Sequence, residues 1–247
     1  MSEVGVLVAS LIGLVVGSVV WVMSWSRAHG KALWSGPECA EAVCEAPLGV
    51  AAWLPLLGFG LARRCRRCDG MQPWRRIIFE AGVAAYFGLV AAAHDRVGHW
   101  LIAVMLFAIP LLMVLLIDAW TRFIYTDLVG LGILLGLGLA IGDGPRSLLS
   151  AGLGMLVAAL IFGGFFAVAA LLYRNQNVAP FGLGDVYLAA MIGAMVRFPA
   201  VMQALFFGIL LAGLASVLLL VTGRASRRDP IAYGPYLCLG ALITLVP

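Results

Sequence analysis

The chain has 247 residues, of which 63% are hydrophobic and only 11% are charged. A soluble domain carries about 25% charged residues, so a soluble fold of this size could not bury so much apolar surface, and lipid must solvate most of it. The net charge of +4 is compatible with a nucleic-acid partner, but the placement of the basic residues explains it without one.

Long apolar runs follow one another along the chain. A helix needs roughly 20 apolar residues, sometimes about 17, to cross a bilayer. Runs of this kind predict eight membrane helices, at residues 4–25, 77–93, 99–117, 127–142, 147–172, 186–196 with flanking residues, 199–222 and 231–247. Basic residues follow the first run instead of preceding it, which favours a retained first helix over a secretory signal.

The basic residues are distributed unevenly between the two sets of loops. Arg96, Arg146 and Arg197 lie in the loops of one side, and all the other Lys and Arg residues lie in the loops of the opposite side. The richer side is cytoplasmic by the positive-inside rule. This orientation places both termini outside, accounts for the net charge, and predicts a lipid bilayer and no nucleic acid as partner.

One polar segment interrupts the apolar pattern. Residues 26–76 contain the pairs Cys39-x4-Cys44 and Cys65-x2-Cys68. The predicted fold class is therefore an all-α membrane protein of about eight transmembrane helices with a small cysteine-containing cytoplasmic domain between helices 1 and 2. Its predicted parts are a first transmembrane helix (1–25), the cysteine-rich domain (26–76) and a seven-helix domain (77–247).

The four cysteines predict a structural metal site. Disulfides are rare on the cytoplasmic side of a membrane, and two cysteine pairs suit tetrahedral Zn²⁺. Cys39, Cys44, Cys65 and Cys68 are the predicted ligands. Unmetallated thiols or a redox pair are the alternatives.

Few acids lie within or beside the apolar runs, where a charge is costly and therefore a candidate for function. Asp118 ends the third run, Asp185 opens the sixth, and Glu80 and Asp127 lie near the starts of the second and fourth. All four fall at cytoplasmic ends. Two carboxyl groups at one depth can share a proton, so that one activates water while the other protonates a scissile carbonyl.

Other interpretations of the same acids stay open. A single acid at a helix end is more commonly solvated or paired with Arg, which suits Asp127, and Gly-Leu-Gly-Asp suits a helix-capping turn. Gly182 and Gly184 also permit close backbone approach, which would suit an extended peptide. A transporter or channel using these acids as a proton or cation site is the main alternative, although acids gathered at one face disfavour it. A catalytically silent assembly protein is a further alternative.

Taken in order, the motifs resemble those of the type IV prepilin peptidases, the leader peptidases of bacterial pilus and type II secretion systems. The resemblance runs nearly end to end. The motifs that carry it are Gly17-Ser18, Cys65-Arg66-Arg67-Cys68, Glu80, Ile117-Asp118 with Ile124, Gly182-Leu183-Gly184-Asp185, and Tyr233-Gly234-Pro235-Tyr236.

The resemblance implies a membrane-embedded aspartic endopeptidase with Asp118 and Asp185 as catalytic residues, supported by Gly182, Gly184 and Glu80. It implies prepilin or pseudopilin substrates, cut after a glycine at the cytoplasmic face of the bacterial inner membrane. It also implies that many members then methylate the new amino terminus with S-adenosylmethionine.

The chain departs from the family pattern at several positions. Cys39 and Cys44 are separated by four residues where the family usually has two. Trp21 stands where the family has Asn, Tyr125 where it has Pro, and Tyr187 where it usually has Lys.

Overall fold

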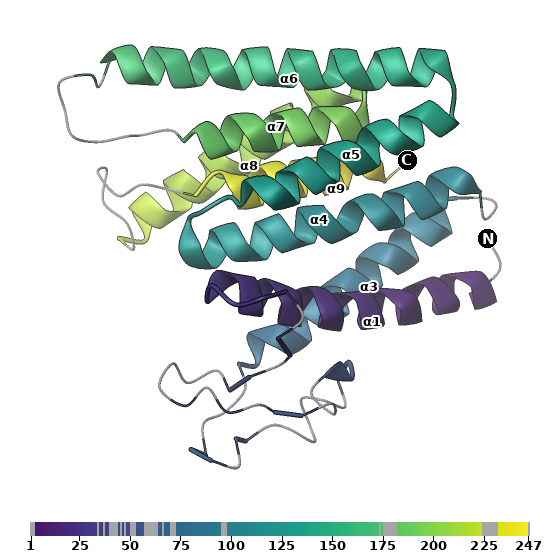
Figure 1. Ribbon diagram of the computed structural model, residues 1–247, viewed down its shortest axis with the longest axis vertical. Coiled ribbons are helices and arrows are strands. Elements are labelled where there is room, and N and C mark those ends of the chain that lie inside the picture. The colour runs from purple at the N-terminus through teal and green to yellow at the C-terminus, as the bar shows by residue number, and fades with distance from the viewer. Residues whose placement is uncertain are drawn as a thin grey trace. The chain divides into compact units, whose positions relative to one another are not determined.

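The computed structural model of the protein describes residues 3–33, 35–36, 38–39, 44, 46, 48–49, 53–56, 64–65, 67–69, 73–94, 98–172, 174, 182–223 and 232–246. Within these residues the regular elements are helices and no β-strand is present (Figure 1). They are α1 (Glu3–Ala28), α3 (Arg75–Ala93), α4 (His99–Thr121), α5 (Thr126–Gly142), α6 (Pro145–Leu172), α7 (Leu183–Val196), α8 (Ala200–Val221) and α9 (Gly234–Leu245). The predicted all-α fold is confirmed.

Five of these helices, α1, α3, α4, α6 and α8, are long and apolar enough to cross a membrane. This confirms a multi-pass membrane protein. The other three are apolar but shorter, with 17 residues in α5, 14 in α7 and 12 in α9. The run 231–247 yields a shorter helix because Gly234-Pro235 starts it, and proline is preferred in the first helical turn. Residues 231 and 247 lie outside the described part of the chain.

The chain divides into two compact units, Met1–Met105 with Pro247, and Leu106–Val246. In the first unit, α1 packs along α3. Glycines on one face of α1 permit this approach: a Cβ at Gly13 would lie 2.8 Å from Cα of Ala84, and one at Gly17 would lie 3.1 Å from Cα of Glu80. Small residues allow membrane helices to pack closely where lipid provides no hydrophobic driving force.

In the second unit, α7 is the central helix. It contacts α5, α6, α8 and α9, and every residue from Leu188 to Val196 is buried. Its neighbours approach through glycines as well, since a Cβ at Gly136 of α5 would lie 2.9 Å from the carbonyl carbon of Ala194. A helix that is apolar on all sides suits such a position. The body of α7 is therefore enclosed by its neighbours, whereas its first turn, which contains Asp185, is only partly buried.

Candidate active site and cysteine cluster

Asp118 lies in the last turn of α4, within the second unit. Its side chain is only 4% exposed, and its Oδ2 atom has no hydrogen-bond partner among the described residues. The helix closes directly after it, because Arg122 adopts a left-handed conformation (φ 56°) and its N–H donates to the Asp118 carbonyl at 2.8 Å. A buried acid that lacks a full set of partners is a strong candidate for chemistry.

Asp185 lies in the first turn of α7 and is half-buried. The N–H of Gly182, the N-cap residue, donates to its Oδ2 at 3.4 Å. Gly184 packs against the segment that follows Asp118, because a Cβ at this position would lie 3.1 Å from Cβ of Ile124. The absence of a side chain at Gly184 thus lets the start of α7 lie against the connection between α4 and α5.

The structure places Asp118 and Asp185 within electrostatic range of each other. The charge of one carboxyl group acts on the other, and the buried thiol of Cys238 on α9 lies within electrostatic reach of both. Two such carboxyl groups can hold one proton between them. Asp127 is exposed in the first turn of α5, where its Oδ1 accepts the N–H of Leu128 at 2.9 Å.

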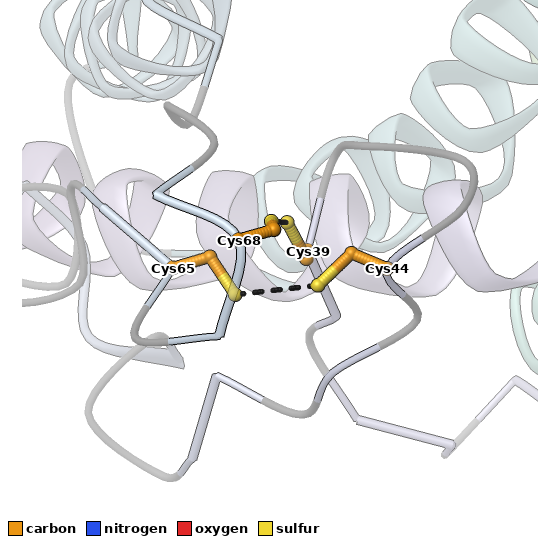
Figure 2. A group of neighbouring side chains, drawn as sticks. All are labelled: Cys39, Cys44, Cys65 and Cys68. Atoms are coloured by element: carbon orange, nitrogen blue, oxygen red, sulfur yellow. Dashed lines mark hydrogen bonds between the residues drawn. The ribbon is translucent and has the colours of Figure 1, made fainter.

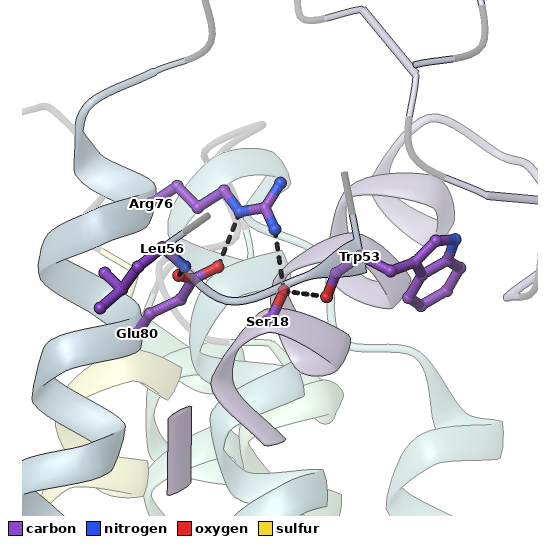
Figure 3. Close-up of polar contacts among 5 residues, drawn as sticks. All are labelled: Ser18, Trp53, Leu56, Arg76 and Glu80. Carbon is purple, nitrogen blue, oxygen red and sulfur yellow. Dashed lines mark hydrogen bonds and ion pairs between the residues drawn. The ribbon is translucent and has the colours of Figure 1, made fainter. Parts of the chain in front are cut away.

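Glu80 lies in the first unit, fully buried on α3. Its Oε1 accepts from Nε of Arg76 at 2.8 Å, and its Oε2 accepts from the backbone N–H of Leu56 at 2.8 Å (Figure 3). Arg76 is itself 2% exposed, so the two form a buried ion pair. The predicted role of Glu80 as a support of the active site stays a prediction.

The same network reaches α1 and the polar segment between α1 and α3. A terminal nitrogen of Arg76 donates to Oγ of Ser18 at 2.8 Å, and Ser18 donates onward to the carbonyl of Trp53 at 2.8 Å (Figure 3). Residues 53–56 are thereby fixed to α1 and α3 of the first unit. The uneven distribution of basic residues places Arg76 in the cytoplasmic set of loops, and this role was not predicted from the sequence. Its spacing of four residues from Glu80 was the available signal, since such residues are neighbours on a helix.

The four predicted metal ligands gather in one place, also within the first unit. All four are in the thiol form, not in disulfides, and their sulfur atoms lie within 4.8 Å of one another. Sγ of Cys39 is 3.4 Å from that of Cys68, and Sγ of Cys44 is 3.6 Å from that of Cys65 (Figure 2). The cluster forms despite the four-residue spacing of the first pair, because each sulfur of that pair faces one of the second.

The geometry and chemistry of this cluster fit a tetrahedral metal ion. Zn–S bonds of about 2.3 Å place the sulfurs of a tetrahedron about 3.8 Å apart, close to the separations observed. Backbone N–H groups of Arg67 and Cys68 lower the pKa of Cys65 to about 6, whereas the side-chain hydrogen bond with Cys68 and burial raise the pKa of Cys44. The thiolate, which is the form that binds metal, is thus favoured at Cys65.

The fold defines a multi-pass helical membrane protein. Residues 105–217 match the type IV leader peptidase family, and residues 11–94 match the bacterial peptidase A24 N-terminal domain. The chain therefore belongs to the type IV leader peptidase family, the membrane-embedded aspartic endopeptidases that remove the leaders of type IV prepilins. The predicted resemblance is confirmed, and the transporter alternative is not favoured. No curated protein and no solved structure matches the chain.

Proposed function

We propose that this chain cleaves the leader of prepilin or pseudopilin substrates with Asp118 and Asp185 as its catalytic pair. The observation that carries the proposal is the approach of these two carboxyl groups, from separate motifs, within electrostatic range. Both also fall inside the matched peptidase segment 105–217. The basic loops support cleavage at the cytoplasmic face of the bacterial inner membrane.

The proposed mechanism uses the pair as acid and base. One carboxylate takes a proton from water, the resulting hydroxide attacks the scissile carbonyl carbon, and the other carboxyl group donates its proton to the carbonyl oxygen. Collapse of the tetrahedral intermediate then breaks the C–N bond: one hydroxyl of the intermediate returns its proton to the pair, and the pair protonates the departing amine. Gly182, which has no side chain and is exposed at the start of α7, would leave room for an extended peptide beside Asp185, and Gly184 would support it by packing against Ile124.

We expect the purified protein, reconstituted in liposomes, to shorten a leader-bearing prepilin by its basic leader, with the new amino terminus after a glycine. Mass spectrometry of the product locates the cut. A substrate in which that glycine is replaced by a bulky residue is the control and should remain intact. Uncut substrate together with proton or cation flux through the same liposomes would favour the transporter alternative.

Methyl transfer to the new amino terminus is the second activity that we propose. It is supported by the match of residues 11–94 to the family's N-terminal domain, whereas Trp21 departs from the family pattern. With S-adenosylmethionine present, the expected product carries one added methyl group at its new amino terminus. An unmodified terminus from an active preparation would leave the chain a peptidase only.

We further propose that Cys39, Cys44, Cys65 and Cys68 hold a structural Zn²⁺ within the cytoplasmic domain 26–76. Bound there, the ion would cross-link two distant parts of a segment that has little regular structure of its own in its described residues.

Elemental analysis is expected to give close to one zinc per chain. Cys65→Ser should lose most of this metal and increase hydrogen exchange in the described residues of the domain, with the helices retained. Cys238→Ser is the matched control and should retain the metal, because Cys238 is buried on α9, outside the cluster. A metal-free wild type whose four thiols alkylate freely would contradict the site.

A further inference from the structure

Helix α9 begins directly against the carboxyl group of Asp118. Its first residue, Gly234, is buried. A Cβ at this position would overlap Oδ2 of Asp118 and would lie 3.0 Å from its Cγ and 3.4 Å from its Cβ. Any side chain at position 234 must therefore move the carboxyl group.

The start of α9 also supplies an electrostatic contact. The backbone N–H of Gly234 interacts with the Asp118 carboxyl group, and the amino end of a helix carries a partial positive charge. Asp118 lies at the carboxyl end of its own helix α4, where the partial charge is negative and disfavours an anion. The start of α9 thus adds a favourable field at this carboxyl group, beside the charge of Arg122.

We propose that Gly234 is a positioning residue for the reaction: its bare backbone holds the Asp118 carboxyl group in the orientation that faces Asp185 and water. This inference rests on the proposed function, in which Asp118 is catalytic. It makes α9 a third part of the active site, beside the segments that contain Asp118 and Asp185.

The kind of atom that a new Cβ would meet distinguishes a glycine that positions a side chain from a glycine that is needed for helix packing. At Gly234 it would meet the end of an aspartate side chain, which can rotate away at little cost in stability. At Gly240, six residues further along the same helix, it would overlap the backbone of α8 and lie 2.9 Å from Cα of Gly208, which cannot rotate away. At Gly213 on α8, a new Cβ would have no atom within 4 Å among the described residues beyond its own stretch of helix.

The test compares Gly234→Ala, Gly240→Ala and Gly213→Ala in liposomes. Gly234→Ala is expected to lower kcat roughly 100-fold, since a displacement of about 1 Å can cost that much. Its KM should stay within about twofold, because the substrate contacts are unchanged. Gly240→Ala should lower thermal stability, and Gly213→Ala should leave both activity and stability unchanged.

The outcomes separate this inference from the proposed function. Wild-type kcat in Gly234→Ala, with Asp118→Asn inactive, would overturn the positioning role alone, whereas an active Asp118→Asn would overturn the proposed function. If Gly234→Ala folds poorly, its stability loss is measured again in an Asp118→Ala background. The loss should largely disappear there, because the clashing atoms are gone, and an undiminished loss would refute the contact.

Discussion

Asp118→Asn and Asp185→Asn are each expected to lower the rate of leader cleavage by at least about 10²-fold. General acid–base groups contribute roughly 10²- to 10⁴-fold. Each substitution removes an ionisable group and keeps its size, so loss of packing is not the cause. In the proposed mechanism the two groups share one proton, so the double variant should be no slower than the slower single variant. Initial rates in liposomes, with circular dichroism to verify folding, measure the effect.

Asp127→Asn is the matched control for this prediction. It removes the same charge nine residues after Asp118, from an exposed side chain that contacts the Leu128 N–H. We expect it to retain most activity. Loss of activity in Asp127→Asn, with activity kept in Asp118→Asn, would mean that the wrong acid of the first motif was chosen. Near wild-type cleavage by Asp185→Asn would contradict the proposed mechanism.

The sequence predicts the helices well because each apolar run must close its own backbone hydrogen bonds in lipid. It does not predict that α7 is the central helix of the second unit. In a membrane, both lipid-facing and protein-facing residues are apolar, so the run 186–196 carries no sign of which neighbours it meets. Glycines such as Gly136 and Gly193 mark close packing, but their partners become known only from the fold.

The candidate sites, like the fold, have features that the sequence predicts and features that it does not. The clustering of the cysteines and the meeting of Asp118 with Asp185 could be predicted, because the residue types and their places at helix ends are enough. The contact of Gly234 with Asp118 could not, since it joins residues more than a hundred positions apart and involves no side chain of its own. The Arg76–Glu80 pair was not predicted, because Arg76 directly precedes the apolar run 77–93 and was attributed to the positive-inside pattern.

The second large effect is expected at this buried ion pair. Glu80→Gln leaves the guanidinium of Arg76, which is 2% exposed, without its counter-charge. Removal of one partner from a buried pair costs about 3–5 kcal/mol. We expect a loss of this size in the free energy of unfolding, measured by denaturant titration in detergent.

Two further variants separate charge burial from anchoring. Asp69→Asn breaks an exposed pair with Arg64, 3.4 Å apart, and should change stability by less than about 1 kcal/mol. A double Arg76→Leu and Glu80→Leu variant removes both buried charges, so most of the stability should return. The Leu56 amide, which donates to Glu80 at 2.8 Å, would then have lost its acceptor and should exchange hydrogen faster than in the wild type.

Leader cleavage by the double variant then decides what Glu80 does. If Glu80 only anchors residues 53–56 to α1 and α3, the double variant should cleave at a rate close to wild type once it is folded. If Glu80 supports the active site as the sequence predicts, cleavage should stay low even though stability has returned. A Glu80→Gln protein as stable as wild type would contradict the buried pair itself, because removal of one charge from a buried ion pair cannot be without cost.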